Sequence, residues 1–195
     1  MLNSRFFILL TLVFSASVAY GYHSEMQAKR SSTKAGMPSP IQFSGQLNDA
    51  YSPLQVALGR AGVKVVINTE ICKQKIVVGW HQGNSGEIIL CTDRMLETTS
   101  SQSSYQDLLQ STLAHEATHV AQICRRYKHG IPIVGVDMAK LKALPANVQN
   151  YIKISTRIGD AQLSPALEWR VEAEGFYHED RPSEVVSLLN HHCSG

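Results

Sequence analysis

An excess of charge of either sign is the first feature that this sequence lacks. Its 195 residues contain 18 Lys and Arg against 16 Asp and Glu, a net charge of +2 at pH 7. Proteins that attract nucleic acids or acidic membranes over a distance carry a clear excess of positive charge. We therefore expect neither nucleic acid nor a membrane surface among the partners of this chain.

A hydrophobic run long enough to cross a bilayer, roughly 20 residues, is also missing. The apolar run at residues 6–14 follows Arg5 and precedes the small residues Ser17 and Ala19. This order is typical of a secretory signal peptide, the alternative being an uncleaved anchor. We predict a signal peptide at residues 1–19, a flexible leader at 20–40 and one folded domain at 41–195, in a secreted or periplasmic protein.

No two cysteines have the C-x-x-C spacing of a cysteine zinc site. An even number of cysteines in an exported chain instead indicates two disulfides. We expect one between Cys72 and Cys91, bracing a local pair of strands. The other would join Cys124 to Cys193 and tie the C-terminus to the central helix.

The order of the predicted elements indicates an α+β fold, a small antiparallel sheet followed by a helical half. A first helix at 52–62 precedes strands rich in Val and Ile at 63–67, 75–80 and 86–91, the last two forming a hairpin. Helical periodicity then begins near Ser104, which has capping-box spacing to Asp107, and ends at Gly130. Three shorter helices are expected at 145–158, 164–178 and 183–191.

The central helix contains the stretch HEATH, residues 115–119. His115 and His119 are four residues apart, so their imidazoles lie on one helix face and can occupy two positions around a zinc ion. Glu116 lies about 100° around the helix, where it can act as a general base on metal-bound water. The alternative is an ordinary helical turn with two histidines, but this stretch lies centrally in a long helical segment.

A third ligand must come from elsewhere. Gln122 and Arg125 stand where the metzincin pattern requires a glycine and a third histidine, so that arrangement is excluded. The remaining common solution is a carboxylate from a later helix, and residues 166–180 are rich in them. Glu168 and Glu172 share one helix face there, and either can serve as the ligand.

At this point the chain resembles the gluzincin zinc metallopeptidases, whose third ligand is a downstream Glu followed three positions later by a small residue. The resemblance implies a zincin-like domain and favours Glu172, which has Gly175 at that position, over Glu168, which has Val171. Glu168 would then orient a ligand histidine through its ring N–H or serve as the alternative ligand.

Residues 86–126 also resemble, more weakly, the mitochondrial intermembrane-space metalloproteases that process an ATP synthase subunit, on the segments GEIILC and HEATHVAQICR. Both resemblances imply a strand at 86–91 that lines the cleft and can pair with an extended peptide. We expect a secreted zinc-dependent peptidase with Zn²⁺ as cofactor and a peptide or protein as substrate. The alternative is a non-catalytic, disulfide-stapled binding module with a structural or vestigial zinc site.

Overall fold

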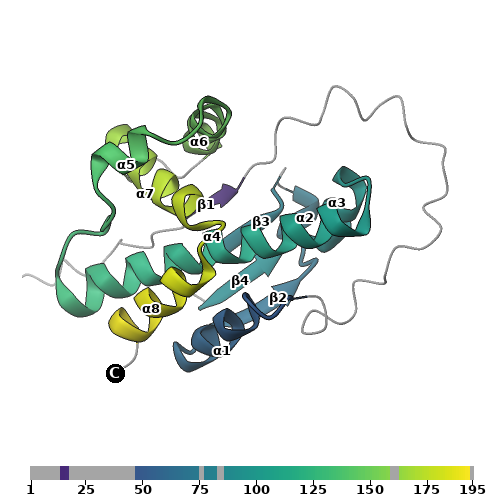
Figure 1. The fold of residues 1–195 in the computed structure, drawn as a ribbon, viewed down its shortest axis with the longest axis horizontal. Helices are drawn as coiled ribbons and strands as arrows, with labels where there is room; N and C mark the ends of the chain where they lie inside the picture. Colours follow the sequence, from purple (N-terminus) through teal and green to yellow (C-terminus); the bar gives the residue numbers. More distant parts are fainter. Residues whose placement is uncertain (1–13, 18–46, 75–76, 83–85, 159–162, 194–195) are drawn as a thin grey trace, which may run out of the picture.

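The computed structural model describes residues 14–17, 47–74, 77–82, 86–158 and 163–193, and these residues form the predicted α+β fold (Figure 1). Most of the expected signal peptide and all of the expected leader lie outside the described residues. No helix in the described part of the chain is long and apolar enough to span a membrane.

The elements follow one another in a strand-and-helix half and a helical half. The first half comprises β1 (Phe14–Ser17), α1 (Ser52–Arg60), β2 (Lys64–Ile67), α2 (Ile71–Gln74), β3 (Gly79–Gln82), β4 (Glu87–Leu90) and α3 (Thr92–Thr98). The second comprises α4 (Gln102–His129), α5 (Met138–Lys142), α6 (Ala146–Ile158), α7 (Pro165–His178) and α8 (Pro182–His192).

The sheet is mixed, with the strand order β1-β3-β4-β2. The expected hairpin is confirmed, because β3 and β4 pair antiparallel with Gly79 opposite Leu90. The expectation of an antiparallel sheet is wrong for β2, which pairs parallel with β4. The reason is that β2 leads through α2 to β3, on the far side of β4, instead of turning back in a hairpin.

The strand order also corrects the expected role of residues 86–91. β4 has β3 on one side and β2 on the other, so its backbone groups are already paired and it cannot accept an extended peptide. In this sheet β3 likewise has a neighbour on each side, β4 and β1, with Phe14 of β1 opposite His81. β1 lies within the predicted signal peptide, residues 1–19, so cleavage of that peptide would leave β3 as an edge strand.

The long helix α4 connects the two halves of the molecule and carries the HEATH stretch. Its N-terminus is capped by Ser101, whose hydroxyl accepts from the Ser104 backbone N–H in a capping box, three residues before the expected cap at Ser104. Its C-terminus ends at Gly130 in the left-handed conformation, as expected. Figure 1 shows α5, α6 and α7 grouped to one side of α4 and α1 beside α8.

Apolar side chains from α1, α4, α8 and the sheet make the main core. On α4 the apolar residues that recur at steps of three and four positions are buried. Leu109, Leu113 and Ala117 are fully covered, and Val120 is nearly so. A second cluster, which includes Leu141, Ile152 and Val171, packs α5, α6 and α7 together. Ile123 of α4 also packs against this second cluster, which therefore holds α7 against α4 and brings Glu172 close to the two histidines.

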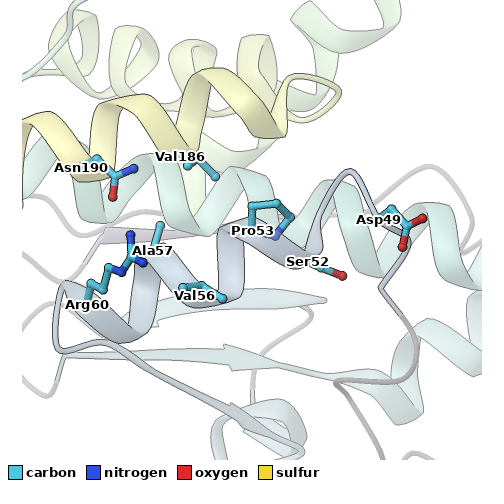
Figure 2. A pocket seen from close by; sticks show the side chains of 8 residues that line it. All are labelled: Asp49, Ser52, Pro53, Val56, Ala57, Arg60, Val186 and Asn190. Carbon is cyan, nitrogen blue, oxygen red and sulfur yellow. The ribbon is translucent and has the colours of Figure 1, made fainter.

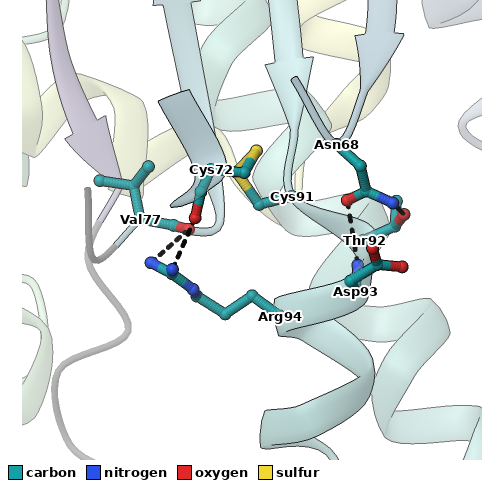
Figure 3. Close-up of a disulfide and its surroundings, with 7 residues drawn as sticks. All are labelled: Asn68, Cys72, Val77, Cys91, Thr92, Asp93 and Arg94. Carbon is teal, nitrogen blue, oxygen red and sulfur yellow. Dashed lines mark hydrogen bonds between the residues drawn. A yellow bond between two sulfur atoms is a disulfide. The ribbon is translucent and has the colours of Figure 1, made fainter. Parts of the chain in front are cut away.

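Both expected disulfides form. Cys72 and Cys91 join the end of β4 to α2, and Cys124 and Cys193 join α4 to the end of α8. Figure 3 shows that Arg94 reinforces the first bridge, because its guanidinium donates to the carbonyl oxygens of Cys72 and Val77. The first disulfide thus fixes the four-residue helix α2, and the second fixes the C-terminal end of α8 to α4.

Candidate metal centre

The two histidines of the HEATH stretch lie together on the buried face of α4. His115 and His119 have no exposed surface, and their ring centroids are 4.8 Å apart. This proximity follows from the four-residue spacing, which stacks the side chains one turn apart. Two imidazoles are thus held side by side in the interior, where burying a polar ring costs free energy unless it has a partner.

Glu172 of α7 reaches both imidazoles. Its Oε2 lies 3.6 Å from His115 Nε2 and its Oε1 lies 3.5 Å from His119 Nε2. Zinc bonds of about 2.1 Å at tetrahedral angles place neighbouring ligand atoms roughly 3.4 Å apart. One nitrogen from each ring and one carboxylate oxygen lie within 4.8 Å of one another, so the donor types and their separations fit a bound divalent cation.

A glycine allows α7 to approach α4 this closely. A Cβ atom built on Gly175 would lie 2.8 Å from both Cε1 and Nε2 of His115. Any side chain at this position would therefore push the imidazole away from Glu172. The small residue expected three positions after Glu172 therefore lies at the point where the two helices approach each other.

The carboxylates around His115 change its protonation. Burial disfavours the charged imidazolium, but the carboxylates of Glu172 and Glu179 outweigh burial and raise the pKa of His115 to about 10. For His119, burial dominates and lowers the pKa, with the nearby charge of His115 opposing the pull of Glu172. Without a cation, one proton on His115 thus balances the buried carboxylate, and a metal ion would replace it.

The ring nitrogens that face away from the group are held by Glu179 and Gln122. His115 Nδ1 lies 3.0 Å from Glu179 Oε1, and His119 Nδ1 lies 2.8 Å from Gln122 Oε1. These are the positions that we expected Glu168 to fill. Glu168 is buried on α7, one turn before Glu172. The three-residue group that could hold a metal ion contains Glu172 and not Glu168.

Glu116, the expected general base, is fully buried beside β3. A Cβ built on Gly79 would lie 2.8 Å from Glu116 Oε1 and 2.4 Å from a methyl carbon of Thr112. The absence of a side chain at Gly79 therefore lets the backbone of β3 pass directly over the carboxylate. Since Glu116 directly follows His115, the same turn of α4 carries a ligand histidine and a carboxylate that packs against β3.

His81 is a further buried histidine that the sequence did not single out. It lies on the same strand face as Gly79, two residues further along β3, and is 3% exposed. Burial, and to a lesser extent the charge of His119, lower the pKa of His81 to about 3. His81 therefore remains neutral at pH 7, close to the second ligand histidine.

The helical half contains four side chains whose chemistry would allow them to stabilise an oxyanion: Tyr151, Arg170, Tyr177 and His178. His178 is buried and its Nδ1 lies 3.5 Å from Glu184 Oε2, while the ring of Tyr177 packs under the Arg181 guanidinium. These contacts give the two residues structural partners outside the metal group.

A surface pocket of about 440 Å³ lies elsewhere, between α1 and α8 (Figure 2). Six residues at or just before α1 and two on α8 line it, and none belongs to the metal group: Asp49, Ser52, Pro53, Val56, Ala57, Arg60, Val186 and Asn190. The pocket and the metal group are therefore separate features of the molecule.

Fold and site together define the chain as an α+β protein with two disulfides and a buried two-histidine, one-glutamate group that can hold a metal ion. The chain belongs to the family described as a domain of unknown function, DUF8637, whose family model matches residues 54–194. No curated protein and no solved structure matches the chain. The matched region includes the whole candidate metal group and all four cysteines.

Proposed function

We propose that the protein is a secreted or periplasmic zinc-dependent metallopeptidase. His115, His119 and Glu172 would hold the ion, which supplies Lewis-acid activation of water when it is bound. Glu116 would take the proton of that water and pass it to the leaving amine. The observation that carries the proposal is the group of three buried donors at metal-binding separations, with the buried carboxylate of Glu116 directly following His115 on α4.

The number of protein ligands supports a catalytic role for the ion rather than a structural one. Structural zinc sites have four protein ligands, whereas catalytic sites have three and leave one position for water. Among the described residues, the group contains three donors and no fourth His, Cys, Asp or Glu. The alternative, a binding module with a structural or vestigial zinc, requires a fourth protein ligand.

The arrangement of β3 supports a peptide as the substrate class. β3 is the strand that passes directly over Glu116, and β1 pairs antiparallel along its edge away from β4. This pairing indicates that the side of β3 away from β4 can accept an extended backbone. A peptide substrate in the same position would place its backbone beside the general base and the metal group.

The test is the Glu116→Gln variant of the full chain, assayed for zinc content by mass spectrometry and for hydrolysis of an unstructured peptide library. We expect one zinc per chain in both proteins and a loss of hydrolysis of roughly 10²–10⁴-fold in the variant, because the amide cannot accept a proton. Glu70→Gln is the matched control, since the Glu70 side chain is 65% exposed and pairs with Lys73 on the surface.

Two results would overturn the proposal. Undiminished hydrolysis by Glu116→Gln would remove Glu116 from the reaction. A zinc-loaded wild-type protein that cleaves no peptide in the library would favour the non-catalytic binding module.

A further inference from the structure

A fully buried carboxylate, Glu174, lies outside the ligand group and is not used by the proposed reaction. Its side chain has no exposed surface and accepts several hydrogen bonds. Arg125 Nη1 donates to Oε1 at 3.1 Å, and the backbone N–H groups of Gly135 and Val136 donate to the same oxygen at 2.9 and 3.2 Å. This set of donors holds the carboxylate in one orientation.

The other oxygen of Glu174 points to the metal group through Gln122. Gln122 Nε2 donates to Glu174 Oε2 at 2.8 Å and to the Val171 carbonyl oxygen at 3.1 Å. Since both neighbours on this side are acceptors, the amide nitrogen must face them. The amide oxygen must therefore face the other way, toward His119.

This orientation decides which ring nitrogen of His119 carries the proton. Gln122 Oε1 can only accept, and it lies 2.8 Å from His119 Nδ1. Nδ1 must therefore be the protonated nitrogen, which leaves a lone pair on Nε2, the atom 3.5 Å from Glu172. A histidine needs that lone pair to bind a metal ion.

We infer that Glu174 and Gln122 form a buried relay that fixes the His119 imidazole with its proton on Nδ1, and so presents Nε2 as a metal ligand. Both are positioning residues, and Glu174 acts through Gln122. The inference rests on the metal-binding part of the proposed function and not on hydrolysis. It also explains the buried Arg125, whose guanidinium balances the charge of Glu174 and packs where Gly135 has no side chain.

The experiment measures zinc affinity of the full chain by competition with a chromophoric chelator, with no substrate present. Gln122→Met removes the amide at nearly constant volume and Glu174→Gln removes the carboxylate charge. We expect each to weaken zinc binding by roughly 10- to 100-fold, the usual effect of losing a group that orients a ligand. Glu184→Gln, a carboxylate on α8 that is 53% exposed, is the control and should bind zinc as the wild type does.

The double variant Gln122→Met with Glu174→Gln tests whether Glu174 acts through Gln122. We expect the double variant to bind zinc no more weakly than Gln122→Met alone, because the relay is already broken. Full additivity of the two losses would contradict the inference. Wild-type zinc affinity in Gln122→Met would also contradict it. This variant keeps Glu174 and Arg125 in place, so it tests the inference even if Glu174→Gln does not fold.

Nitrogen NMR of the histidine rings provides a readout that a general loss of stability would not change. In the zinc-free wild-type protein we expect the neutral form of His119 to carry its proton on Nδ1, and in Gln122→Met we expect a mixture of both tautomers. A proton on Nε2 of His119 in the wild type would overturn the inference. Either result stands independently of the Glu116→Gln assay, which tests the reaction alone.

Discussion

Glu172 completes the candidate metal group, and the resemblance to the gluzincins favoured it over Glu168. The reason is local: a small residue three positions later permits close helix packing, and Gly175 does contact His115. Glu179, Gln122 and Glu174 could not be assigned in the same way. Their roles depend on which side chains of α4 and α7 converge, and one-dimensional spacing does not determine that.

His81 gives a pH dependence that belongs to a single side chain. Burial and the charge of His119 lower its pKa to about 3, whereas a free histidine titrates near 6.5. Between these values the unfolded chain binds a proton that the folded protein does not. Stability should therefore fall as the pH is lowered from 6.5 toward 3.

The His81→Gln variant should lose this sensitivity. Urea unfolding of the metal-free protein at pH 7.5 and pH 5 should show that the variant loses about 2 kcal/mol less than the wild type on acidification. The exposed His191→Gln serves as the control and should behave like the wild type. Equal losses in His81→Gln and the wild type would show that His81 is not held neutral.

At the scale of elements, periodicity and caps predicted the long helices well. The helices expected at 145–158, 164–178 and 183–191 correspond to α6, α7 and α8 within one or two residues. The short helices α2, α3 and α5 were not predicted, because four to seven residues give too little periodicity to recognise. The parallel pairing of β2 was also missed, since strand direction depends on the whole chain path.

The contact between α4 and α7 gives a prediction at this scale. Gly175→Ala should displace the His115 ring, because a methyl group would lie 2.8 Å from its atoms. We expect zinc affinity to fall by at least about tenfold, measured by chelator competition. Gly59→Ala in α1 is the matched control, because a Cβ there has no heavy atom within 4 Å. Unchanged zinc binding in Gly175→Ala would contradict the close packing of the two helices.

At the scale of the whole molecule, the two disulfides constrain very different lengths of chain. Cys72–Cys91 closes 19 residues and Cys124–Cys193 closes 69. The cysteine count predicted two disulfides, and of the three pairings that four cysteines permit, the expected one is the pairing that forms. The two disulfides are compatible with an exported protein.

Removing each bridge by a pair of Cys→Ala substitutions should therefore have unequal effects. Loop-closure entropy predicts that loss of Cys124–Cys193 lowers the free energy of unfolding by about 1 kcal/mol more than loss of Cys72–Cys91. Denaturant unfolding under non-reducing conditions measures both. A larger loss on removing Cys72–Cys91 would show that local strand bracing outweighs the entropy of the longer loop.

The central claim is that two imidazoles from α4 and one carboxylate from α7 bind a single ion and leave one coordination position to solvent. X-ray absorption spectroscopy of the zinc-loaded protein measures this coordination directly. We predict four nitrogen or oxygen neighbours at about 2.0–2.1 Å, two of them imidazoles, and a changed spectrum when Glu172 is replaced by Gln. A third imidazole, a sulfur ligand, or a spectrum that Glu172→Gln leaves unchanged would contradict the account.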